Sequence, residues 1–140
     1  MSEGKNEAQY LMDATLLLVE QLLLEHNEFY PLGLATDIKG NIVSVAAHNG
    51  DDFPKSNELI SLLEDAFRLK ASNGEYLTTA LAYDVKLRVS ATQKVDAIAF
   101  NLDHYSGYSV IVYLPHEINN GKVEYGNIQA TQGLNSIFAK

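Results

Sequence analysis

Four histidines are the side chains of this sequence best suited to proton transfer or to metal binding. They are His26, His48, His104 and His116. A zinc-type site needs three or four such ligands gathered around one point. His104 and His116 each follow one of two neighbouring strands in a predicted antiparallel meander, so we expect them at opposite ends of the sheet. The pattern therefore predicts no metal site, and we expect no cofactor.

The segment Asp103-His104-Tyr105 is the best local candidate for acid–base chemistry. A carboxylate beside a histidine can tune its charge and orientation. Successive residues of a strand, however, point to opposite faces, so Asp103 need not touch His104. The nearby Gly107 favours a turn in which Asp103 caps the bend. We expect no catalytic residue here, and we take Asp103, His104 and Tyr113 as candidates for binding a small ligand.

Other motifs that carry chemistry are missing or incomplete. His116-Glu117 does not begin a zinc-protease motif, because Asn120 stands where the second histidine would be needed. Asp51-Asp52 lacks the spacing of a calcium loop. The chain has no cysteine, and its serines lie in no nucleophile elbow or phosphate-binding loop. An enzyme is therefore the less favoured reading, although convergent sites can escape a motif search.

The charge of the chain limits the partners that it can bind. There are 18 acidic and 10 basic residues in 140, a formal charge of -8. Nucleic acid and anionic membranes bind cationic surfaces, so we expect neither as a partner. The first 70 residues hold 12 of the acidic side chains, which could attract a basic partner protein. The first apolar run is short, is broken by Glu20 and follows acidic residues, so we expect a cytoplasmic protein.

The elements that must position these residues begin with a leucine-rich helix over about residues 6 to 27. Its apolar residues cover more than one face. Either its own sheet wraps around the helix, or the second face meets another subunit, which predicts a homo-oligomer. Tyrosine is common at interfaces because its ring is buried while its hydroxyl stays hydrogen-bonded. The interface candidates are Leu17, Leu18, Leu24, Tyr105 and Tyr108.

The rest of the chain alternates strands with one further helix. We expect a hairpin over residues 32 to 47, a helix over residues 56 to 73, and a meander over residues 77 to 89, 97 to 102 and 108 to 114. Residues 1 to 5 should be frayed, and residues 116 to 140 could be a short strand or a helical tail. The prediction is one α+β domain over residues 1 to 140, with helices packed on an antiparallel sheet of about five strands in the order α-β-β-α-β-β-β.

That order of elements, over residues 8 to 115, resembles profilin-like and roadblock-like domains, which implies a layered fold that often pairs through helices or sheet edges. In sequence, the chain is similar to short uncharacterised bacterial cytosolic proteins at Phe29-Tyr30-Pro31-Leu32-Gly33, at residues 97 to 104 and at residues 110 to 115. This second likeness implies a bacterial origin and no particular activity.

Two functions follow from these observations. The first is a non-enzymatic interaction module that self-associates and binds another macromolecule, for example as an inhibitor or immunity-type protein that masks a basic surface. The alternative is a protein or enzyme that binds a small ligand in a pocket between a helix and the sheet.

Overall fold

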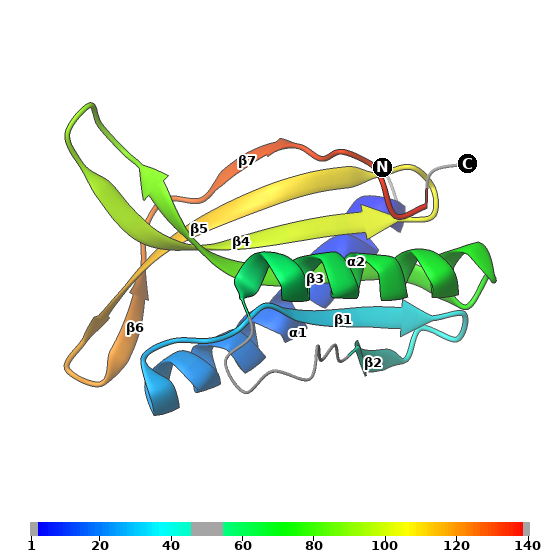
Figure 1. Ribbon diagram of the computed structural model, residues 1–140, viewed down its shortest axis with the longest axis horizontal. Coiled ribbons are helices and arrows are strands. Elements are labelled where there is room, and N and C mark those ends of the chain that lie inside the picture. The colour runs from blue at the N-terminus through cyan, green and yellow to red at the C-terminus, as the bar shows by residue number, and fades with distance from the viewer. Residues whose placement is uncertain (1–2, 46–54, 139–140) are drawn as a thin grey trace.

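The computed structural model describes residues 3–45 and 55–138, in which two helices flank an antiparallel sheet (Figure 1). The elements follow one another as α1 (Glu3–His26), β1 (Leu32–Asp37), β2 (Ile42–Val45), α2 (Ser56–Ser72), β3 (Tyr76–Arg88), β4 (Lys94–His104), β5 (Ser109–Asn119), β6 (Lys122–Tyr125) and β7 (Gln129–Gln132). The prediction of an α+β fold with an antiparallel sheet is confirmed.

The sheet has seven strands in the part of the chain that the structure describes, instead of about five. Its order is β2-β1-β3-β4-β5-β6, and β7 pairs with β5 on the side away from β4. The two additional strands come from the region beyond residue 115. Asn120 and Gly121 both have positive φ angles, which a tight two-residue hairpin turn between β5 and β6 requires. Residues 129–132 have no apolar alternation that could have predicted β7.

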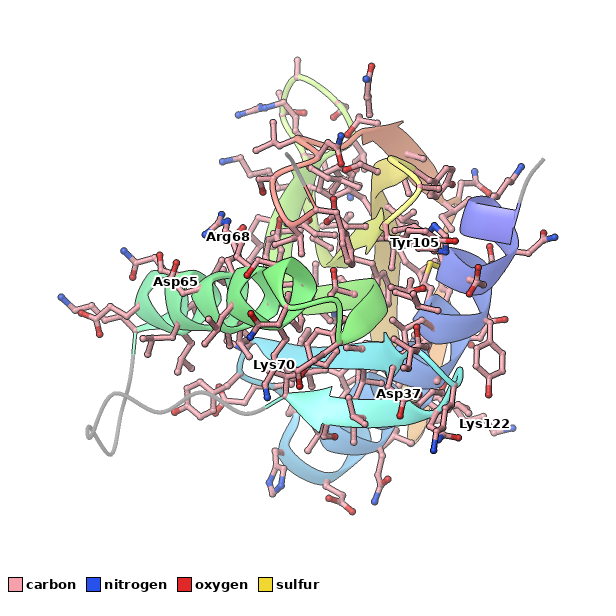
Figure 2. The ribbon with its side chains drawn as sticks, turned by 90° about the vertical axis from the view of Figure 1, so that its right-hand side faces the viewer. Asp37, Asp65, Arg68, Lys70, Tyr105 and Lys122 are labelled. Carbon is pink, nitrogen blue, oxygen red and sulfur yellow. The ribbon has the colours of Figure 1, made fainter. Side chains whose placement is uncertain are left out.

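The two helices lie on opposite faces of the sheet, as Figure 2 shows from the side. α1 contributes Leu11, Val19 and Leu23 to a core with Phe100 on β4. α2 contributes Leu63 and Phe67 to a second core on the other face. Because both faces are covered, the central strands are buried almost continuously, over residues 78–82 of β3 and 97–100 of β4.

One difference from the expected boundaries concerns the start of the chain. α1 begins at Glu3, so residues 3 to 5 are helical and not frayed. Gly4 lies close to the turn between β4 and β5, and a Cβ atom there would lie 2.7 Å from Ser106 Oγ. Tertiary contact therefore holds the first turn of α1. His48 and Asp51-Asp52 lie outside the described residues.

Candidate functional site

The three residues predicted to bind a ligand are not gathered at one place. Asp103 and His104 are neighbours near the end of β4 and point to opposite faces of the sheet. Tyr113 has the same parity on β5 as Ser109, the residue that pairs with Asp103, so it shares the face of Asp103. His104 lies on the α1 face and Asp103 on the α2 face, where they belong to two separate polar clusters.

The first cluster is built around the buried imidazole of His104, which is 1% exposed. Its Nε2 lies 2.8 Å from Glu7 Oε2 on α1, and its Nδ1 lies 2.8 Å from Ser106 Oγ. The backbone N–H of Ser106 also donates to Nδ1, at 3.1 Å. Because Nδ1 accepts this bond, the ring carries its proton on Nε2 and donates it to the Glu7 carboxylate.

A hydroxyl, an imidazole and a carboxylate in this order are the groups that general-base catalysis uses to activate a serine. The surroundings favour a structural role instead. Gly4 packs against Ser106 Oγ and against the imidazole, where a Cβ atom would lie 3.2 Å from Nδ1. The cluster therefore ties the first turns of α1 to the β4–β5 turn. The sequence pattern does not indicate Glu7, because 97 residues separate it from His104 and no local spacing connects them.

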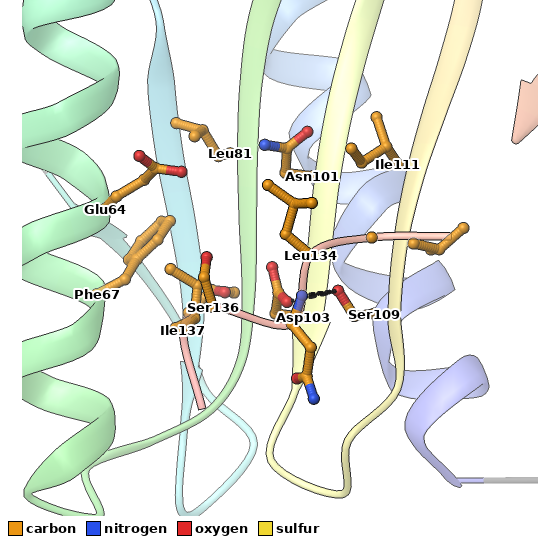
Figure 3. A pocket seen from close by; sticks show the side chains of 14 residues that line it. Glu64, Phe67, Leu81, Asn101, Asp103, Ser109, Ile111, Leu134, Ser136 and Ile137 are labelled. Carbon is orange, nitrogen blue, oxygen red and sulfur yellow. Dashed lines mark hydrogen bonds between the residues drawn. The ribbon is translucent and has the colours of Figure 1, made fainter. Parts of the chain in front are cut away.

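The second cluster lies beside a small cavity on the α2 face (Figure 3). Asp103 Oδ1 accepts a hydrogen bond of 2.8 Å from the Ser109 hydroxyl. The Ser109 oxygen in turn accepts a hydrogen bond of 3.0 Å from the backbone N–H of Asn135. Glu64 and Phe67 reach the cavity from α2, and residues 133–137 cross over it. The cavity has a volume of about 20 Å³. That is room for about one water molecule and not for a metabolite.

The environment of Asp103 changes its ionisation. Burial raises the pKa of the Asp103 carboxyl above its ordinary value of 3.8, and the nearby Glu64 acts in the same direction. The hydrogen bond from Ser109 and the charge of Arg68 lower the pKa and offset part of this effect. Folding thus favours the protonated form of this carboxyl.

Asp103→Asn should make stability less dependent on pH. A carboxyl whose pKa is raised by folding stabilises the folded state below its ordinary pKa, and this contribution is lost as the pH rises through the folded value. In urea unfolding from about pH 3 to about pH 7, the variant should gain stability relative to the wild type as the pH rises. Ser109→Ala removes a hydrogen bond to the Asp103 carboxylate, so the stability of this variant should fall more steeply than that of the wild type as the pH rises. Parallel pH profiles for the wild type and Asp103→Asn would contradict this account.

The residues predicted for an interface divide into two groups. Leu17 and Leu24 on α1 are 70% and 47% exposed, and Tyr105 in the β4–β5 turn is also exposed (Figure 2). Leu18 and Tyr108 are partly buried and pack against the core under α1. Tyr10, which is not among the predicted interface residues, is 59% exposed on α1. The outer side of α1 therefore keeps large apolar side chains in solvent.

Among the described residues, no group of three histidine, aspartate or glutamate side chains could hold a metal ion. Neither described helix is long and apolar enough to cross a membrane. Comparisons of the chain with protein-family models, curated proteins and solved structures found no match.

Proposed function

We propose that this protein is a non-enzymatic interaction module that self-associates through the outer side of α1. The observation that carries the proposal is the apolar stripe formed by Tyr10, Leu17 and Leu24. These residues recur every seven positions and so lie in one line along the helix. Full burial of one leucine side chain is favourable by about 1.5–3 kcal/mol, so a partner surface that covers the stripe gains a substantial free energy of binding.

The occupant that best fits this stripe is a second copy of the same chain. In a two-fold interface the same patch serves both partners. If two α1 helices pair in antiparallel orientation with Leu17 at the two-fold axis, Tyr10 of each copy meets Leu24 of the other. The contact between Tyr10 and Leu24 then occurs twice and covers both ends of the stripe.

The polar side chains beside the stripe suit the same arrangement. Within one chain the Gln9 amide donates to Asp13 at 2.8 Å, and the Gln21 amide donates to Glu25 at 3.3 Å. Antiparallel pairing about Leu17 places Gln21 opposite Asp13 of the other copy, and Gln9 opposite Glu25. Amide donors therefore face carboxylate acceptors across the pair, and these acidic residues do not oppose one another.

Leu17→Glu should dissociate the pair, because it places two carboxylates against each other at the two-fold axis. Sedimentation and light scattering should give a dimer mass for the wild type at high micromolar concentration and a monomer mass for the variant. The milder Leu17→Ala should weaken dimerisation by about tenfold or more, since about 1.4 kcal/mol corresponds to a factor of ten.

The matched control is Leu69→Glu, which introduces the same charge at a leucine that is 62% exposed on α2. This variant should keep the wild-type mass. A monomeric wild type at high micromolar concentration, or equal loss of dimer in both glutamate variants, would overturn the proposal.

The proposal also includes binding of another macromolecule and a bacterial cytosolic setting. The acidic first half of the chain supports a basic partner, and the absence of cysteine is compatible with a reducing compartment. An inhibitor or immunity-type role is one form of this proposal. The profilin-like or roadblock-like layer stays a proposal too, supported by two helices, α1 and α2, on opposite faces of one antiparallel sheet.

A further inference from the structure

The sheet divides into two arms at Pro115. β4 and β5 pair only from Ala97 with Pro115 to Asp103 with Ser109. Beyond Pro115, β5 pairs with β6 instead, while the first residues of β4 stay paired with β3. Figure 1 shows the tips of the β3–β4 and β5–β6 hairpins diverging. The space between these two arms, lined by residues 93–96, 115–118 and 124–126, is called the fork groove below, and its volume is about 690 Å³.

One side of the fork groove, the β5–β6 hairpin, is bonded to α1. The Tyr125 hydroxyl at the end of β6 donates a hydrogen bond of 2.6 Å to Glu20 on α1. Burial and the adjacent Glu20 carboxylate raise the pKa of Tyr125, so the hydroxyl stays protonated and keeps donating. This bond ties the β5–β6 hairpin to α1.

One wall of the groove is an open strand edge of β4. The Val89 amide donates to the Gln93 carbonyl, and the His104 amide donates to the Tyr108 carbonyl. Because backbone polar groups alternate in direction along an antiparallel strand, the odd residues of β4 face β3 and the even ones face β5. Lys94 and Asp96 therefore point their N–H and C=O groups into the groove, where the register gives them no strand partner.

The opposite wall is an open edge of β5. The Gly126 amide donates to the Pro115 carbonyl, which places the odd residues of this part of β5 toward β6. By the same alternation, the backbone groups of His116 and Ile118 face the groove. Two strand edges thus face each other across the fork.

The side chain of His116 is a second, independent sign of a binding site. It lines the groove and is only 6% exposed, yet neither ring nitrogen has a hydrogen-bond partner among the described residues. The nearest carboxylate, that of Asp84, is 3.9 Å from Nε2, beyond hydrogen-bond distance. Buried polar atoms in native proteins are almost always paired, so this ring is a candidate to accept a bond from a ligand.

We propose that the fork groove binds an extended segment of a basic partner protein by β-strand addition. The open edges supply main-chain hydrogen bonds, as in other domains that add a strand from a partner. The groove is lined by the acidic residues Asp96, Glu117 and Glu124 and by the basic residues Lys86 and Lys94, and Lys86 is already paired with Asp96. With Asp84 beside it, the groove keeps an acidic excess, which favours a basic segment. This surface is separate from the apolar stripe of α1.

The direct test uses an end-blocked Lys-Val-Lys-Val-Lys peptide and the full chain labelled with ¹⁵N. Amide shifts should change at Lys94, Asp96, His116 and Ile118, because these residues face the peptide. The same peptide with methylated backbone nitrogens should bind at least about tenfold more weakly, since it lacks the donors for several bonds. A Glu-Val-Glu-Val-Glu peptide should leave the shifts unchanged. Equal binding of the methylated peptide, or shifts confined to other residues, would overturn the proposal.

A matched pair of variants tests the open edge itself. Lys94→Pro removes the N–H that points into the groove and leaves the bonds from β4 to β3 in place, as prolines on edge strands do. Lys94→Ala keeps this N–H and loses the same charge. The alanine variant should bind the basic peptide at least as tightly as the wild type, because a like charge is removed, and the proline variant should bind about tenfold more weakly than the alanine variant.

Both variants should keep the wild-type unfolding midpoint and the same sedimentation mass, so that failure of the α1 dimer and failure of the fork groove are distinguishable. Equal peptide affinity in both variants would contradict strand addition. A change of mass in Lys94→Pro alone would mean that a second copy of the chain occupies the groove, which overturns the proposed partner.

Discussion

Phe67→Ala should lower the free energy of unfolding by about 3–5 kcal/mol, as large-to-small changes at fully buried aromatic residues do. Phe67 is 1% exposed and belongs to the core under α2. Its ring packs on Gly33 of β1, where a Cβ atom would lie only 2.7 Å from Phe67 Cζ. It also meets the Tyr76 ring edge-on, with centroids 6.4 Å apart. The core on this face is small, so few neighbours can fill the space.

The cavity beside Asp103 makes the effect of Phe67→Ala larger. Phe67 already lines that cavity, so truncation joins the lost ring volume to it. The loss in the free energy of unfolding is measured by urea denaturation monitored by circular dichroism. Leu69→Ala, at an exposed position of the same helix, is the control and should change stability by less than about 0.5 kcal/mol. A loss below about 1 kcal/mol for Phe67→Ala would show that α2 contributes little to the fold.

His104→Ala should be the second large loss, about 2–4 kcal/mol, because it removes a buried ring together with its hydrogen bonds. The imidazole connects Glu7 on α1 with Ser106 in the β4–β5 turn, both at 2.8 Å. Without it, the first turns of α1 keep the contact of Gly4 but lose their polar tie to the sheet. We therefore expect hydrogen exchange at residues 5 to 11 to accelerate, while exchange in α2 stays as in the wild type.

Glu7→Gln is the matched variant for this cluster. Its side-chain oxygen can still accept the Nε2–H of His104, so the bond becomes neutral but is kept. The loss of stability should be about half that of His104→Ala or less, with little change in the exchange of α1. If Glu7→Gln and His104→Ala were equally damaging, the charge of Glu7 and not the imidazole would hold the helix.

Much of the fold could be predicted from local pattern. Alternation placed the strands of the meander, and helical spacing placed α1 and α2 within a few residues of their observed ends. Alternation also predicted that Asp103 and His104 need not touch, because it decides which face a strand residue occupies. For residues 116 to 140 the sequence pattern allows a short strand or a helical tail, and the folded chain forms β6 and β7 there. β7 was missed because its residues are all exposed and its position depends on pairing with β5.

The candidate sites depended far more on the tertiary structure. The sequence by itself determined which side of each helix and strand is apolar, since periodicity is a local property of the chain. It thereby predicted that α1 has surplus apolar surface, and Leu17 and Leu24 are indeed exposed. Only the folded chain decided that Glu7 meets His104, that Asn135 meets Ser109, and that the sheet divides at Pro115. These contacts join residues far apart in sequence, and register and packing, which no local spacing encodes, select them.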